Sequence, residues 1–388
     1  MVMEGRQQKQ LSATRSDPPT APGMPTAAAL TGVVLVVVLA AVALLWAKWL
    51  PYTAKAAGLG TSHHWSGSSI LTVGGVRPGD APTWAAATSF LSAYVTAVWK
   101  ALLAALLISA AVQALVPTNW LVRLMNRRGR IGSAAMGGLL STPSMMCTCC
   151  TAPVATTLRR NGVRTSAAVA YWLGNPLLNP AVLIFLVLVA PWQWTAVRLV
   201  VGIALVVGGA ALVERLTTDR VALPVGADAV NLGPLDLPAV GAGAGGDVPT
   251  DARWLAGAPA RFARTLARLL LTLVPEYLAV VLLIGAVRGW LFPLGDSSAS
   301  WGVVVVLLAA VVGTAMVIPT AGEIPILQGL ALAGLSLGGI GALLVTLPAV
   351  SLPGIAMVGK ALGWRTTWMT AAVVVVGGVV AGGLLAVL

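Results

Sequence analysis

The sequence has little charge for its length. Asp, Glu, Lys and Arg make up only 9% of its 388 residues, whereas 58% are hydrophobic and the mean hydropathy is +0.90. A soluble domain usually has about a quarter of its residues charged. The shortage of charge therefore excludes a soluble globular protein and predicts an integral membrane protein embedded in a lipid bilayer.

Cysteines are also scarce, and signals for nucleotide binding are missing. The three cysteines fall within four positions, and this spacing excludes a framework of disulfides. The glycine-rich stretch 240–246 lacks the Lys-Ser/Thr of a phosphate-binding loop, so ATP-driven transport would require another subunit. The net charge of +12 does not indicate a nucleic-acid partner, because most basic residues lie in short connections between apolar runs.

Seven apolar runs are long enough to cross a bilayer as helices. They cover about residues 26–50, 84–116, 165–190, 194–213, 269–292, 337–358 and 367–388. Two shorter apolar stretches, 131–160 and 302–334, are interrupted by glycine and proline and predict re-entrant hairpins. The sequence thus predicts an all-α polytopic membrane protein with about seven transmembrane helices and two re-entrant broken-helix hairpins.

Composition divides the chain into five parts. They are a disordered cytoplasmic N-terminus (1–25), an extra transmembrane helix with an external loop (26–83), a first membrane repeat (84–213), a flexible cytoplasmic linker (214–267) and a second membrane repeat (268–388). The external loop is expected to begin at residue 51. An amphipathic helix is expected over residues 252–268, where the linker ends.

The two membrane halves resemble each other. A shift of 172 residues places Pro153 on Pro325 and Pro176 on Pro348, with the hairpin and the proline-broken span in the same order. Segments interrupted by Gly or Pro at corresponding positions of two halves indicate the binding site of a transporter.

The distribution of Lys and Arg predicts the orientation in the plasma membrane. With the N-terminus in the cytoplasm, the cytoplasmic segments hold 18 of the 24 basic residues, in agreement with the positive-inside rule. This orientation opens the first hairpin to the cytoplasm and the second to the outside. The repeats are therefore predicted to be inverted, which is typical of alternating-access transporters.

A sulfur-rich stretch from Ser141 to Pro153 is the strongest chemical signal. Thiolates and thioethers are soft ligands that select Cu(I), Zn(II) or similar ions. Pro143 and Pro153 are expected to break helices on either side. The predicted metal ligands are Cys147, Cys149, Cys150 and Met146, and the wider substrate site adds Met145, Asn175, Asn179 and Ser351. The alternative is that the cysteines pack as small hydrophobes.

Two carboxylates, Glu276 and Glu323, lie inside predicted membrane segments. An ionisable group at this depth costs at least ~2.5 kcal/mol, so it is a functional candidate. Both are predicted to serve proton coupling, and the alternative is a protonated carboxyl with a local hydrogen bond. Lys100 and Arg198 are weaker candidates, expected to be paired or to reach the membrane surface.

These motifs resemble those of the ArsP-like predicted permeases, which include organoarsenical efflux permeases and relatives linked to copper or zinc efflux. The resemblance covers about residues 85–388. The Pro-x-Cys-x-Cys-Gly-x-x-Pro hairpin of that family is similar to the segment 147–153, and its Glu-Ile-Pro and Ser-Leu-Pro segments are similar to 323–325 and 351–353. Here Cys150 replaces the glycine. The resemblance implies a permease, and the extra thiol favours Cu(I).

Three classes of function follow. The first is an efflux permease for Cu(I), or alternatively for a trivalent arsenical, with the transported ion as substrate and no cofactor. The second is a membrane thiol–disulfide electron conduit, which requires a reactive cysteine in each half, whereas the second half has none. The third is a non-catalytic scaffold. An enzyme is not expected. A cytosolic thiol protein that delivers the metal and a homo-oligomer stay open as partners.

Overall fold

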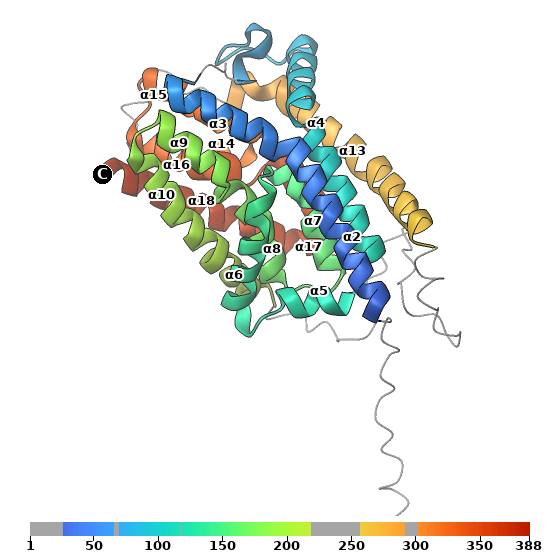
Figure 1. The fold of residues 1–388 in the computed structure, drawn as a ribbon. Helices are drawn as coiled ribbons and strands as arrows, with labels where there is room; N and C mark the ends of the chain where they lie inside the picture. Colours follow the sequence, from blue (N-terminus) through green and yellow to red (C-terminus); the bar gives the residue numbers. More distant parts are fainter. Residues whose placement is uncertain (1–25, 66–69, 117, 219–256, 292–301) are drawn as a thin grey trace, which may run out of the picture.

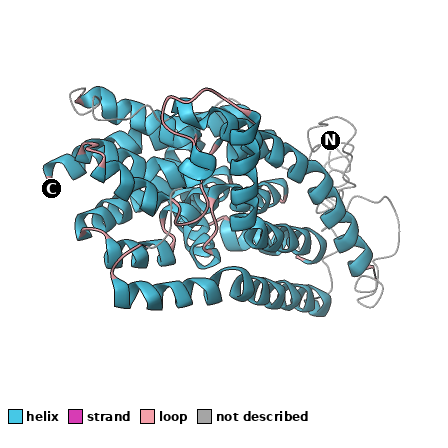
Figure 2. Cartoon of the chain, turned by 90° about the horizontal axis from the view of Figure 1, so that it is seen from above, coloured by secondary structure: helices cyan, strands magenta, loops and turns pink. Residues whose placement is uncertain are grey.

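The computed structural model describes residues 26–65, 70–116, 118–218, 257–291 and 302–388. Within these ranges every regular element is a helix (Figures 1 and 2). The all-α prediction is therefore confirmed. The N-terminal segment 1–25 and most of the predicted linker lie outside the described residues.

Seven membrane spans are present among the described residues, if one bent pair of helices is counted as a span. The first five are α2–η1–α3 (Thr26–Leu44, Leu45–Trp49, Leu50–Ser62), α4 (Trp84–Leu115), α8–α9 (Thr165–Leu177, Pro180–Val189), α10–η4–α11 (Trp192–Ile203, Ala204–Gly209, Ala210–Thr218) and α13 (Ala258–Leu291). The bent pair is α16–α17 (Leu337–Ala349, Leu352–Leu362), with an angle of 50°, and the last span is α18 (Trp364–Val387). The seven agree with the apolar runs of the sequence.

Two helix ends differ from the sequence-based expectation. The external loop does not begin at residue 51 as expected, because the first helix continues through the π-helical segment η1 and α3 as far as Ser62. A π-turn changes the hydrogen-bond register just before Pro51, so the missing N–H of the proline is tolerated. The helix expected over 252–268 is confirmed in its described part, from Ala258, but it runs on without a break as α13, so the fifth span begins earlier than the expected residue 269.

Both hairpins consist of two short helices separated by an irregular break. The first is α6 (Gly129–Ser141), the 3₁₀ turn η3 (Thr142–Ser144) and α7 (Thr148–Arg160), and the second is α14 (Val303–Ala315) and α15 (Glu323–Leu332). Each break contains a non-glycine residue in the left-handed region, Met145 (φ 49°) and Ala321 (φ 68°). The expected break at Pro153 is wrong, because this proline lies inside α7.

The element order repeats in the two halves. The helices α16, α17 and α18 each begin 172 residues after α8, α9 and α10, the shift found in the sequence. The halves are intertwined and do not form separate lobes, because α4 packs on α13, α7 on α17 and α10 on α18. The opposite orientation of the two repeats in the bilayer stays a prediction.

Glycines allow neighbouring helices to approach closely, both between a hairpin and a span and between two spans. A Cβ on Gly137 of α6 would lie 2.2 Å from the carbonyl oxygen of Ala167 in α8, and one on Gly382 of α18 would lie 2.6 Å from the carbonyl oxygen of Gly338 in α16. Small residues of this kind let membrane helices pack backbone against backbone. The first hairpin is thereby held tightly against the proline-broken span.

The predicted topology can be tested by labelling single cysteines in a background without Cys147, Cys149 and Cys150. Arg128→Cys and Arg160→Cys, at the two ends of the first hairpin, should react only from the cytoplasm, because both ends of a re-entrant segment face one side. Ala333→Cys, at the end of the second hairpin, should react only from outside. Labelling of Arg160→Cys and Ala333→Cys from the same side would contradict inverted repeats.

Candidate functional site

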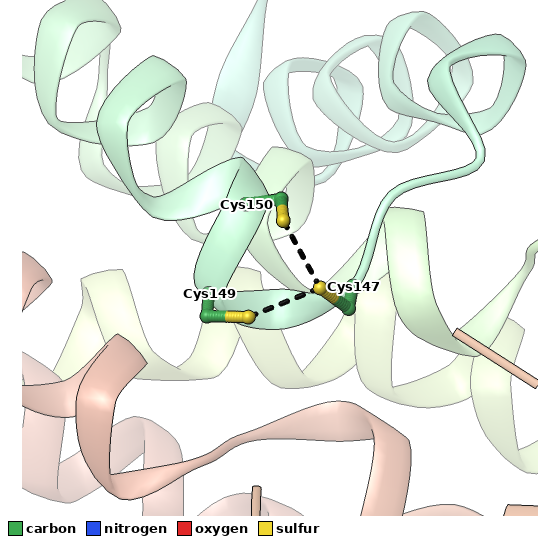
Figure 3. Close-up of side chains that lie close together, drawn as sticks. All are labelled: Cys147, Cys149 and Cys150. Carbon is green, nitrogen blue, oxygen red and sulfur yellow. Dashed lines mark hydrogen bonds between the residues drawn. The ribbon is translucent and has the colours of Figure 1, made fainter. Parts of the chain in front are cut away.

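Three thiols converge where the first hairpin breaks (Figure 3). The Cys147 Sγ lies 3.0 Å from the Cys149 Sγ and 3.2 Å from the Cys150 Sγ, and the three sulfurs lie within 4.8 Å of one another. All three thiols are free and buried. The convergence results from local structure, because Cys147 has an extended backbone at the N-cap of α7 while Cys149 and Cys150 occupy its first turn.

The N-terminus of α7 is one feature of the site that favours negative charge on the thiols. The first turn of a helix carries N–H groups without intrahelical acceptors and a partial positive charge. A thiolate, which is the form that binds metal, is stabilised at such an end. The hydroxyl of Tyr277 lies 3.5 Å from the Cys149 sulfur and donates to it, and the hydroxyl of Tyr94 lies 3.2 Å from the same atom.

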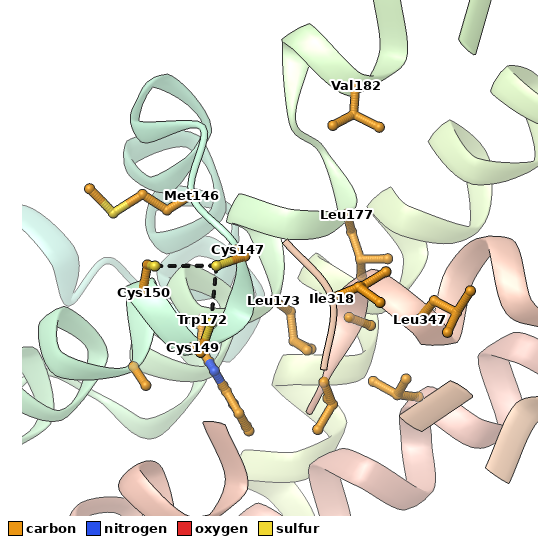
Figure 4. Close-up of a cluster of buried hydrophobic side chains, with 14 of the residues drawn as sticks. Met146, Cys147, Cys149, Cys150, Trp172, Leu173, Leu177, Val182, Ile318 and Leu347 are labelled. Atoms are coloured by element: carbon orange, nitrogen blue, oxygen red, sulfur yellow. Dashed lines mark hydrogen bonds between the residues drawn. The ribbon is translucent and has the colours of Figure 1, made fainter. Parts of the chain in front are cut away.

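Apolar side chains cover much of the cluster. The thiols belong to a buried core that includes Trp172 and Leu173 of the first half and Ile318 and Leu347 of the second (Figure 4). A soft ion held there would be shielded from water, and electrostatic interactions are stronger in such surroundings.

Asn175, a predicted substrate residue, holds the break in place. Its Oδ1 accepts hydrogen bonds from the hydroxyl of Ser144 and from the N–H of Met146 (3.3 Å), and its Nδ2 donates to the carbonyl of Tyr171 (3.3 Å). These bonds stabilise the left-handed turn at Met145, which a side chain rarely adopts without support. In this state the amide of Asn175 is thus occupied by the protein itself.

The other two predicted polar residues, Asn179 and Ser351, each have a buried polar group without a hydrogen-bond partner among the described residues. Asn179 caps α9 by accepting from the N–H groups of Ala181 (3.1 Å) and Val182 (3.4 Å), but its Nδ2 has no partner among the described residues. The hydroxyl of Ser351, between α16 and α17, is likewise buried without a partner there. Buried groups of this kind are costly, so each is available to a polar ligand.

A small cavity joins the breaks of the two hairpins. The residues that line it are Met146, Cys147, Pro176, Ile318, Pro319, Thr320, Glu323 and Pro348. Both halves therefore contribute a hairpin break and a proline-broken span, with Pro176 and Pro348 at positions 172 residues apart. The structure brings the sulfur cluster and Glu323 to one place, although their helices are far apart in the sequence.

Glu323 forms a buried ion pair with Arg198. The Nη2 of Arg198 donates to its Oε1 at 2.9 Å, and the two side chains are 0% and 2% exposed. Arg198 also donates to the carbonyls of Pro176 (2.7 Å) and Leu177 (3.2 Å) at the end of α8.

Arg198 and Lys100 are the weaker functional candidates of the sequence. Arg198 is paired, as expected, whereas Lys100 is exposed near the rings of Trp46 and Trp99. The side chain of Glu276 lies outside the described residues.

Lys48 is a residue of the site that the sequence analysis missed. Although only 5% exposed, it reaches from η1 to the second hairpin, where its Nζ donates to the Thr320 Oγ1 at 3.0 Å. An ionisable residue in a membrane segment is a general functional signal. The sequence does not single out Lys48, because a lysine is ordinary near the end of an apolar run predicted to finish at residue 50.

Comparison with known proteins identifies the family of this chain. A family model described as a predicted permease (ArsP_1) matches residues 83–387. The chain belongs to this predicted permease family. The permease is also similar to the UPF0718 protein YraQ of Escherichia coli (strain K12), with 39% identity over 298 residues that cover 76% of this chain and 78% of the relative. No solved structure matches. The first helix, α2–η1–α3, lies outside the region that matches the family.

The ion pair of the permease can be tested by its effect on stability. Arg198→Met should lower the free energy of unfolding by about 3–5 kcal/mol, because the carboxylate of Glu323 is left buried without a counter-charge. Adding Glu323→Gln should recover a large part of this loss. Thermal unfolding in detergent provides the measurement.

Arg288→Met is the matched control, since Arg288 is buried and donates to backbone carbonyls, including those of Leu71 and Gly285. Adding Glu323→Gln to Arg288→Met should recover nothing. Equal stability of Arg198→Met with and without Glu323→Gln would contradict the role given to the ion pair.

Proposed function

We propose that this permease exports a soft metal ion, Cu(I) in the first place, across the plasma membrane by alternating access. The observation that supports it is the set of three buried, free thiols beside a cavity to which both hairpins contribute. Soft sulfur donors prefer Cu(I) among the metals available to a cell. The predicted orientation opens the first hairpin to the cytoplasm, so loading would take place from inside.

Loading is proposed to occur by ligand exchange with a cytosolic thiol protein. The ion leaves two thiolates of the carrier and bonds to two of Cys147, Cys149 and Cys150, while the two thiol protons of the site pass to the carrier. Such an exchange avoids free Cu(I) and keeps the number of Cu–thiolate bonds constant. The Met146 thioether, beside Cys147 in the cavity, is the proposed third donor.

Release is proposed to depend on a proton that reaches Glu323. Two thiolates hold Cu(I) tightly, so export requires protonation or rearrangement of the ligands. Protonation of Glu323 would abolish its attraction to Arg198 and free the start of α15 from the end of α8. The second hairpin could then move and open the cavity to the outside. Glu276 on α13 is a second candidate for carrying the proton.

A trivalent arsenical is the second candidate substrate, and the third cysteine favours it. As(III) forms three bonds, and three sulfurs within 4.8 Å of one another could all bind one arsenic atom. A thiol–disulfide conduit has less support, because the chain contains no cysteine outside this cluster to accept the electrons.

Replacement of single thiols tests the proposal. Cys147→Ser or Cys149→Ser should weaken Cu(I) binding by more than about 100-fold, beyond the 10–100-fold effect of groups that only support a metal ligand. These variants should no longer export copper from cells or accumulate it in everted vesicles. Binding is measured by competition with a chromogenic Cu(I) chelator. Glu323→Gln should leave affinity within about threefold, less than 1 kcal/mol, and slow release.

Thr151→Ala is the control, because the hydroxyl of Thr151 is buried on the same helix and bonds to carbonyls of its own turn, including that of Thr148 at 3.0 Å. This variant should bind and export normally. Undiminished export of both copper and arsenicals by the triple Cys→Ser variant would show that the cluster serves packing alone.

A further inference from the structure

We infer that Lys48, on a helix outside the region that matches the family, is a specificity-determining residue that favours Cu(I) over trivalent arsenicals. Its ammonium would balance the negative charge of a Cu(I)–dithiolate complex in the cavity. This inference rests on the proposed function and concerns the same site.

The surroundings of Lys48 stabilise an ammonium group, but no described carboxylate balances its charge. Its Nζ donates to the hydroxyls of Thr320 (3.0 Å) and Tyr52 (3.1 Å) and lies 5.0 Å from the centre of the Tyr52 ring. Hydroxyl acceptors and an aromatic face all stabilise an ammonium. It forms no ion pair with any carboxylate in the part of the chain that the structure describes. A buried charge without a counter-charge is costly, so a ligand that supplies the counter-charge is favoured.

The missing negative charge would arise next to Lys48. Thr320, the acceptor from Lys48, lines the cavity together with Cys147 and Met146. The ammonium is also within range of electrostatic interaction with Cys147 and Cys150. A metal bound to these thiolates would therefore lie in the field of Lys48, in surroundings where that field is weakly screened.

The charge of the bound complex differs between the two candidate substrates. Cu(I) held by two thiolates forms a complex with a net charge of −1, which the ammonium neutralises. A phenylarsenical held by two thiolates is neutral, and so is As(III) held by three. The ammonium thus stabilises the copper complex and gives an arsenical complex no comparable gain.

The helix that carries Lys48 is held in position at the site. The neighbouring residue Trp49 donates from its Nε1 to the carbonyl of Pro143, in the break of the first hairpin, at 3.1 Å. Two consecutive residues therefore contact the breaks of both hairpins. Both belong to the π-helical segment η1, and π-turns inside helices are frequent at functional sites.

Lys48→Gln tests the inference, because glutamine retains the hydrogen-bonding capacity towards Thr320 but lacks the charge. In the full-length permease, Cu(I) affinity should fall by about 10- to 100-fold, the range typical of groups that support a metal ligand. Affinity for a phenylarsenical should change less than about threefold, which also shows that the variant is folded. Lys48→Arg should restore most of the Cu(I) affinity.

Lys55→Gln is the matched control, since Lys55 lies on the same helix with its ammonium 3.5 Å from the centre of the Trp65 ring and outside the cavity. Its Cu(I) affinity should equal that of the parent. Equal Cu(I) binding by Lys48→Gln and the parent would overturn the assignment of Lys48 and leave the proposed function standing. A parent protein that does not bind Cu(I) would overturn both.

Discussion

The buried ion pair between Arg198 and Glu323 connects the parts of the permease that form the site. Neither charge is stable alone in an apolar interior, and Arg198 gains further stability from two carbonyls at the end of α8. The start of α15, directly after the break of the second hairpin, is therefore fixed to the proline-broken span of the first half. A movement that opens the cavity must either separate this pair or carry α10 along with α15.

The two helix breaks impose a second requirement, since their backbone groups cannot rely on water inside a membrane. The protein satisfies them with side chains from other elements. The hydroxyl of Thr148 donates to the carbonyl of Pro348 in the opposite half, and Trp172 donates to the carbonyl of Thr148 at 3.1 Å. The hydrogen bonds of the breaks thus also connect the two halves around the cavity. This explains why irregular backbone persists where the thiols are presented.

The first helix adds a different type of chemistry to this core. The region that matches the family begins at residue 83 and already contains the thiols, Arg198 and Glu323. The preceding helix contributes a cation, through Lys48, and a hydrogen bond to the first hairpin, through Trp49. In the role inferred for Lys48, the first helix would tune the core for the charge of the proposed cargo without a change in the ligands that hold it.

The sequence alone determined the class of protein, the seven spans, the two broken hairpins and the location of the sulfur cluster. Hydropathy along a run of about 20 residues reports membrane insertion directly. Three cysteines within four positions indicate one cluster, which the turn into α7 brings together. Helix ends were predicted less well, because the local effect of Pro51 or Pro153 depends on the hydrogen-bond register around it. Only the tertiary structure revealed the pairing of Arg198 with Glu323 and the approach of Lys48 to Thr320. These partners are 125 and 272 residues apart, and no local pattern specifies how helices from two halves pack against each other.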